Sequence, residues 1–114
     1  MPYIKTTTTA KINNEKKQAL TEAFGKAIEL IPGKSERWLM LGFSGDTPMA
    51  LGGDSESGAA IMEVQLLGAA ERTHLDALTA ELTKILSDAL GISKDRIYVN
   101  YTSFDTWGWN GENL

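Results

Sequence analysis

The residue at position 2 is the first candidate for chemistry, because it is a proline directly after the initiator methionine. A short residue at this position usually permits removal of the methionine, which would leave Pro2 with a free secondary amine. A free α-amino group titrates around pH 7.7 to 8.0, close to where a general base works best. Pro2 is therefore a candidate base. The structural alternative is that proline simply begins an edge strand.

Few other residues are candidates for catalysis. The chain has no cysteine, which excludes disulfides, thiolate metal sites and thiol chemistry. The single histidine, His74, has no carboxylate or second histidine at ligand spacing, so we expect a solvated helix residue and no metal site. Lys34 follows an expected helix end, where a cation is favoured whatever its function. Three tryptophans could line a pocket or pack an interface: Trp38, Trp107 and Trp109.

Length and charge narrow the class of protein. The 114 residues are the size of one domain, which we expect to span 1–114. The net charge of −4 argues against nucleic acid and anionic membranes as partners. No apolar run reaches the length of a membrane helix and no signal peptide is visible. We expect a cytoplasmic protein, with secretion by a non-classical route left open.

The elements that must position these residues follow from hydrophobic patterning. Strands are predicted for residues 2–9, 38–44, 59–67 and 96–104. Apolar residues at helical spacing predict one helix that ends at Pro32-Gly33 and a second that ends at Gly91. We expect Asn13 or Asn14 to cap the first helix, and Thr73 with Asp76 to form a capping box for the second. Asn110-Gly111 is a turn signal in the tail.

The two halves of the chain match each other at an offset of 58 residues. Ala19-Leu20-Thr21 falls on Ala77-Leu78-Thr79, and Gly33 falls on Gly91. This predicts pseudo-repeats over 2–44 and 59–104, each a βαβ unit, in an α/β (α+β) fold with a four-stranded mixed sheet and two helices on one face. If Leu39 and Leu41 face the helices, Trp38 and Met40 lie on the bare face. Such a face needs cover, so we expect a homo-oligomer.

With these elements in place, the sequence resembles the macrophage migration inhibitory factor family of the tautomerase superfamily, over nearly the whole chain. The resemblance depends on Pro2, on Gly33-Lys34, on the glycine-pair loop 49–56, on Asp95-Arg96-Ile97-Tyr98-Val99-Asn100-Tyr101 and on Gly108-Trp109-Asn110. It implies a homotrimer with an active site at each subunit interface, and no cofactor. It also implies keto–enol tautomerisation of aromatic α-keto acids such as phenylpyruvate.

The same resemblance implies a role for each site residue. Pro2 would be the catalytic base, with Lys34 and the backbone N–H of Leu67 binding the substrate carboxylate or carbonyl. The neighbouring subunit would supply Tyr98 and Asn100. The remaining pocket residues would be Tyr3, Trp38, Gln65, Trp107 and Trp109. As alternatives, Tyr98 and Asn100 are ordinary outward strand residues, and the tryptophans pack a trimer.

This chain departs from the family at several positions. Gly58-Ala59-Ala60-Ile61 stands where many members have a Cys-x-x-Cys pair, so thiol-oxidoreductase activity does not carry over. Tyr3, Trp38 and Trp107 also differ from mammalian members, which suggests a narrower pocket mouth. A competing function is cytokine-like signalling through a host receptor, with the pocket vestigial. A third is a structural trimer without a ligand, which the intact Pro2, Lys34 and Asn100 disfavour.

Overall fold

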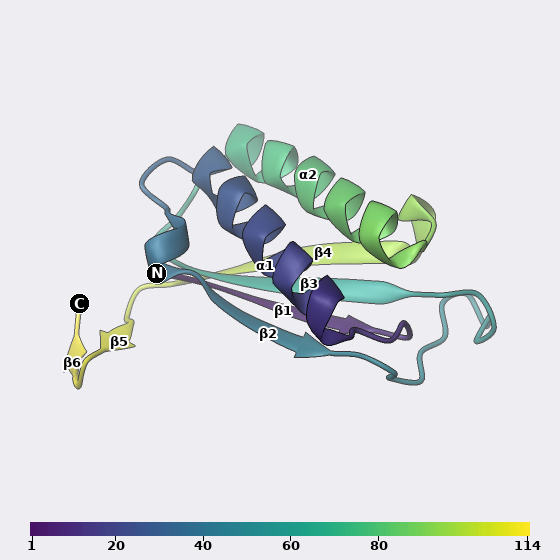
Figure 1. Cartoon of the computed structure of the whole chain (residues 1–114). Helices are drawn as coiled ribbons and strands as arrows, with labels where there is room; N and C mark the ends of the chain where they lie inside the picture. Colours follow the sequence, from purple (N-terminus) through teal and green to yellow (C-terminus); the bar gives the residue numbers. More distant parts are fainter.

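The computed structural model describes residues 1–114 and consists of one sheet covered on one face by two helices (Figure 1). The sheet runs in the order β2-β1-β3-β4, with β1 at Pro2–Thr8, β2 at Met40–Ser44, β3 at Ala60–Leu67 and β4 at Ile97–Phe104. Helices α1 (Asn14–Ala27) and α2 (Arg72–Leu90) lie side by side on that face. The predicted four-stranded mixed sheet with two helices is confirmed. Short 3-10 turns occupy Ile28–Leu30 (η1), Glu36–Trp38 (η2) and Lys94–Arg96 (η3).

The two helices begin and end by different means. The side chain of Asn13 accepts a hydrogen bond from the backbone of Lys16 at 2.8 Å and caps α1, as expected. Gly91 ends α2 in the left-handed region with φ 68°. The predicted capping box at Thr73 is wrong. Helix α2 begins at Arg72, so Thr73 lies inside the helix and cannot cap it. The residue before the helix is Glu71, whose side chain makes no capping hydrogen bond.

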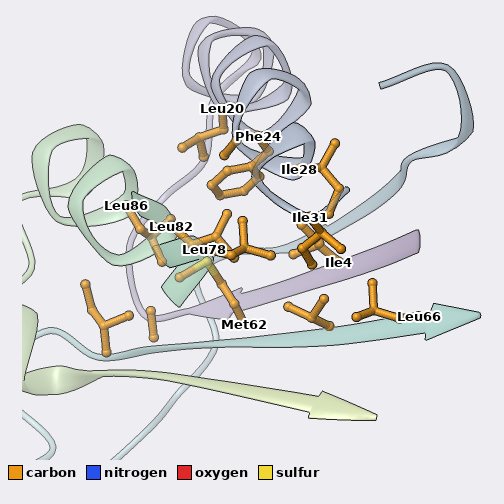
Figure 2. Close-up of a cluster of buried hydrophobic side chains, with 14 of the residues drawn as sticks. Ile4, Leu20, Phe24, Ile28, Ile31, Met62, Leu66, Leu78, Leu82 and Leu86 are labelled. Carbon is orange, nitrogen blue, oxygen red and sulfur yellow. The ribbon is translucent and has the colours of Figure 1, made fainter. Parts of the chain in front are cut away.

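The core lies between the helices and the sheet, where apolar side chains from both layers meet (Figure 2). Ile4 comes from β1, Met62 and Leu66 from β3, and the helices contribute a matching row. The fully buried helix residues are Leu20 and Phe24 of α1 and Leu78, Leu82 and Leu86 of α2. This packing fixes which face of each strand points away from the helices.

The chain repeats one unit twice in space. Strands β1 and β3 begin 58 residues apart, at positions 2 and 60, and helices α1 and α2 begin 58 apart, at 14 and 72. In each half the two strands are parallel, β1 with β2 and β3 with β4, and β1 pairs antiparallel with β3 at the centre. Gly33 and Gly91 both have positive φ, at 82° and 68°.

The second strand is shorter than predicted. It begins at Met40, and Trp38 lies in η2 instead of on the sheet. Strand β1 begins at Pro2 and pairs Tyr3 with Met40, so residue 38 has no partner strand to extend along. The placement of Trp38 on the bare sheet face is therefore wrong, although Met40 does lie there and is 68% exposed.

The face of the sheet away from the helices carries polar as well as apolar side chains. Lys5 of β1 pairs with Glu63 of β3, which pairs with Asn100 of β4. The next row toward Pro2 joins Tyr3, Gln65 and Thr102 in the same way. The same open face exposes Met40 by 68% and Tyr98 by 57%, so it mixes charges and amides with large apolar side chains. The homo-oligomer stays a prediction.

The loop between β2 and β3 is held by Arg96, which follows the second helix. Arg96 donates hydrogen bonds to the carbonyls of Gly58 at 2.6 Å and Asp54 at 3.0 Å. The Asp54 carboxylate accepts from the backbone of Ser57 at 3.0 Å and of Glu56 at 2.8 Å. Hydrogen bonds from Ser57 and Glu56, and then the nearby Arg96 charge, lower the pKa of Asp54 to about 2.

The tail forms a small hairpin beyond the sheet, made of β5 (Gly108–Trp109) and β6 (Glu112–Asn113) (Figure 1). Asn110 and Gly111 make its turn with positive φ angles of 53° and 81°, as the sequence predicted. Neither α1 nor α2 combines the length and apolar character that a membrane crossing needs.

Candidate active site

Three parts of the chain meet where β1 begins. The backbone N–H of Leu67, the last residue of β3, donates to the carbonyl of Met1 at 3.1 Å. The side chain of Lys34, beyond the end of η1, donates from Nζ to the carbonyl of Leu67 at 2.8 Å. Pro2 is buried beside them and pairs with Leu66. The structure thus brings together the three residues expected to do the chemistry.

The N-terminal amine in this position has an altered titration. Burial first, and then the charge and hydrogen bonding of Lys34, hold the pKa of the amine below its ordinary value of 8.0. With Met1 in place, the amine belongs to Met1 and the nitrogen of Pro2 is an amide, which cannot act as a base. The environment nevertheless favours a neutral amine at this end of β1.

A hollow of about 420 Å³ opens on the open face of the sheet. Pro2, Lys34 and Leu67 do not line it, but Tyr3, which follows Pro2, and Phe104, which pairs with Leu67, do. Three of the predicted pocket residues line it: Tyr3, Gln65 and Trp107. Sequence reasoning did not assign the other lining residues to the pocket: Met40, Phe104, Thr106 and Gly108. The strand register would have predicted two of them, because Met40 lies opposite Tyr3 and Phe104 lies opposite Leu67.

Two further predicted pocket residues, Trp38 and Trp109, contact each other next to the hollow-lining Gly108. The rings of Trp38 and Trp109 meet edge to face, with centroids 5.1 Å apart and planes at 89°. Phe104 and Trp107 form a second such pair at 6.1 Å. The tail hairpin is therefore attached to η2 through Trp109, and its neighbour Gly108 lines the hollow.

Two predicted site residues do not reach Pro2 within one chain. Tyr98 and Asn100 lie on the open face of β4, two strands away from β1. Asn100 stands level with Lys5, roughly 10 Å along the strand direction from Pro2, and Tyr98 lies farther still. Both side chains are exposed. They can line the site of Pro2 only if a second copy of the chain brings them there.

The charged side chains are dispersed. No three His, Cys, Asp or Glu residues come together in a way that could hold a metal ion. His74 is located in the first turn of α2 beside a separate hollow, which it lines together with Lys34 and Glu71.

Comparison with known proteins gives one family. The family model described as macrophage migration inhibitory factor (MIF) matches residues 1–114. A search of curated proteins finds no significant match. Among solved structures, MIF2 of Leishmania major is 30% identical, with a TM-score of 0.94 over 100% of this chain and 97% of that one.

Two further structures share the fold. The homologue from Prochlorococcus marinus is 26% identical, with a TM-score of 0.85 over 97% of each chain. The protein Pt0534, solved after inactivation by 2-oxo-3-pentynoate, is 20% identical, with a TM-score of 0.81 over 97% of this chain and 95% of its own.

Proposed function

The chain belongs to the macrophage migration inhibitory factor family, and from this premise we propose that it is a tautomerase that uses Pro2 as its base. The observation that carries the proposal is the meeting of the buried Pro2, Lys34 and the backbone of Leu67, at a place where the pKa of the Met1 amine is held below its ordinary value. Once Met1 is absent, the same surroundings favour the neutral form of the Pro2 amine, and a neutral amine can take a proton from a carbon next to a carbonyl group.

Removal of Met1 prepares the site in two ways. It converts the nitrogen of Pro2 from an amide into an amine, and it releases the Leu67 N–H from the Met1 carbonyl that it contacts at 3.1 Å. The freed N–H then becomes available to a substrate oxygen. A donor aimed at the oxygen where negative charge develops is a large contribution to catalysis.

The donors at this site suit a 2-oxo acid. Lys34 supplies an ammonium group with three N–H donors, one of which is used by Leu67. The other two can hold a carboxylate while the Leu67 N–H holds the neighbouring carbonyl. Pro2 removes a proton from the carbon beyond the carbonyl, and protonated Pro2 returns it to the oxygen. The inactivation of Pt0534 by 2-oxo-3-pentynoate favours this substrate class.

The hollow beside the site favours an aromatic substrate such as phenylpyruvate. Tyr3, Phe104 and Trp107 offer flat apolar surfaces that exclude water from the reacting atoms. A homotrimer completes the proposal, because Tyr98 and Asn100 are exposed on the open face and need a second copy to reach Pro2.

The experiment compares the wild-type protein with Pro2→Gly, after mass spectrometry has shown that Met1 is absent from both. We expect wild type to catalyse the ketonisation of enol-phenylpyruvate, followed by ultraviolet absorbance. Pro2→Gly replaces the secondary amine of the proline ring by a primary amine at the chain start, and we expect it to lose at least about 100-fold in kcat/KM. No turnover by a folded, processed wild-type protein would overturn the proposal and favour cytokine-like receptor binding instead.

A further inference from the structure

Arg37 is the one arginine of the chain without a polar partner inside it. The chain has three arginines. Arg72 pairs with Asp76 at 2.8 Å, and Arg96 is held by the loop carbonyls and Asp54. Arg37 takes part in none of the ion pairs and donates no hydrogen bond. Its neighbour Glu36 packs against Gly25 of α1 and does not neutralise it.

The Arg37 side chain is nevertheless held in a defined place. Its Cζ lies 5.0 Å from the centre of the Trp38 ring, the geometry of a cation–π contact. Trp38 is itself fixed by the edge-to-face contact with Trp109. This contact engages the guanidinium through the ring face and leaves its five N–H donors free for a planar anion.

Arg37 does not line the hollow itself, but its ring partner Trp38 contacts Trp109, which directly follows the hollow-lining Gly108. Lys34 lies three residues before Arg37 and Met40, which lines the hollow, three residues after it. Three residues span at most roughly 10 Å, so both lie within reach of one small molecule.

We propose that Arg37, held over Trp38, is a second anion-binding group, and that the site prefers aromatic 2-oxo acids with a further carboxylate at the far end of the ring. This inference rests on the proposed function for the position of the first carboxylate. Arg37 would bind the second carboxylate of the substrate and would take no part in the proton transfer. A fork-shaped cation is matched to a carboxylate, with which it forms two parallel hydrogen bonds.

The test compares 4-carboxyphenylpyruvate with phenylpyruvate on processed wild type, Arg37→Gln and Arg37→Lys. Wild type should favour the carboxylated substrate, and Arg37→Gln should reduce that preference about fivefold in kcat/KM, through KM. Arg37→Lys should retain part of it, because the charge remains and the fork is lost. Lys11→Gln, which removes an exposed charge at the other end of β1, is the matched control and should change neither substrate.

A second measurement separates this inference from the proposed function. Terephthalate carries two carboxylates and benzoate one, and neither has an enolisable carbon, so their binding does not depend on catalysis. Tryptophan fluorescence should show terephthalate binding weakened about fivefold in Arg37→Gln and benzoate binding unchanged. If wild type fails to turn over phenylpyruvate but shows this difference, the subsite stands and the tautomerase proposal fails. Equal effects on both ligands, or none, would overturn the subsite.

Discussion

Replacing Lys34 by Gln separates the two roles proposed for this residue. Its ammonium group lowers the pKa of the Met1 amine, and we expect it to act in the same way on the Pro2 amine once Met1 is absent. It also has donors left over after the 2.8 Å hydrogen bond to Leu67. Glutamine can still donate to the Leu67 carbonyl, so the local backbone should keep its place. What is lost is the positive charge.

The size of the effect follows from the interaction that disappears. A hydrogen bond to a charged group contributes about 1.5 to 3 kcal/mol. At about 1.4 kcal/mol per factor of ten, kcat/KM for phenylpyruvate should fall about 10- to 100-fold. Most of the loss should appear in KM, because Lys34 holds the carboxylate in the ground state and the transition state alike.

The pH dependence provides a second readout with a fixed sign. The acid limb of kcat/KM reports the pKa of the free enzyme's base. Without the Lys34 charge this pKa should rise, so the acid limb should move to higher pH. Burial is the larger cause of the lowered pKa of the Met1 amine, and Pro2 is buried too. The substitution leaves this burial unchanged, so the limb should stay below the position of an exposed amine.

The assay is ketonisation of enol-phenylpyruvate from about pH 5 to about pH 9, on protein whose mass shows that Met1 is absent. Lys11→Gln controls for net charge. An acid limb that stays in place, or that moves to lower pH, would refute the electrostatic reasoning. An unchanged KM would refute the role of Lys34 in binding the carboxylate.

Two further predictions concern stability. Thr6 and Thr8 are both fully buried on β1, but the Thr6 hydroxyl has no partner while that of Thr8 donates to Ala59 at 2.9 Å. Thr6→Val should therefore raise the free energy of unfolding by about 1 kcal/mol, and Thr8→Val should lower it by about as much or more. Urea unfolding measures both changes, and the same sign for both variants would contradict this explanation. The pKa of Asp54 is lowered to about 2, so its carboxylate stabilises the fold above the unfolded pKa near 4, and this contribution is lost as pH falls toward about 2. Wild type should exceed Asp54→Asn in stability at pH 6 by more than it does near pH 2, and a difference independent of pH would reject this role.

Local patterns predicted most of the fold because they act over a few residues. Alternation along β4 places Tyr98 and Asn100 outward, and a left-handed glycine at Gly91 ends α2. Trp38 was misplaced because its aromatic character favours a strand, whereas strand length depends on the partner. The register of Tyr3 with Met40 leaves residue 38 beyond the start of β1. That register is a long-range property which composition does not reveal.

The site was predictable only in part, for a similar reason. Family resemblance assigns Pro2, Lys34 and Leu67 to one site, and the structure places them side by side, while their roles stay a prediction. No spacing in the sequence joins positions so far apart. Met40 and Phe104 entered the hollow through strand pairing. The sequence does not predict a binding role for Arg37, because a single arginine forms no motif. The proposed role depends on its contact with the Trp38 ring, which is visible only in the three-dimensional structure.

The repetition of one unit at an offset of 58 residues has a consequence for how many sites one chain can hold. The counterpart of Pro2 is Ala60 and that of Lys34 is Ile92, so the second half repeats the scaffold without its reactive groups. The nitrogen of residue 60 is necessarily an amide, because Ala59 precedes it. A polypeptide has a single beginning, and chemistry that requires a free α-amine therefore breaks the twofold equivalence of the halves. When two such units are joined in one chain, only the first can supply the amine, and the second contributes strands and a helix to the shared sheet and core.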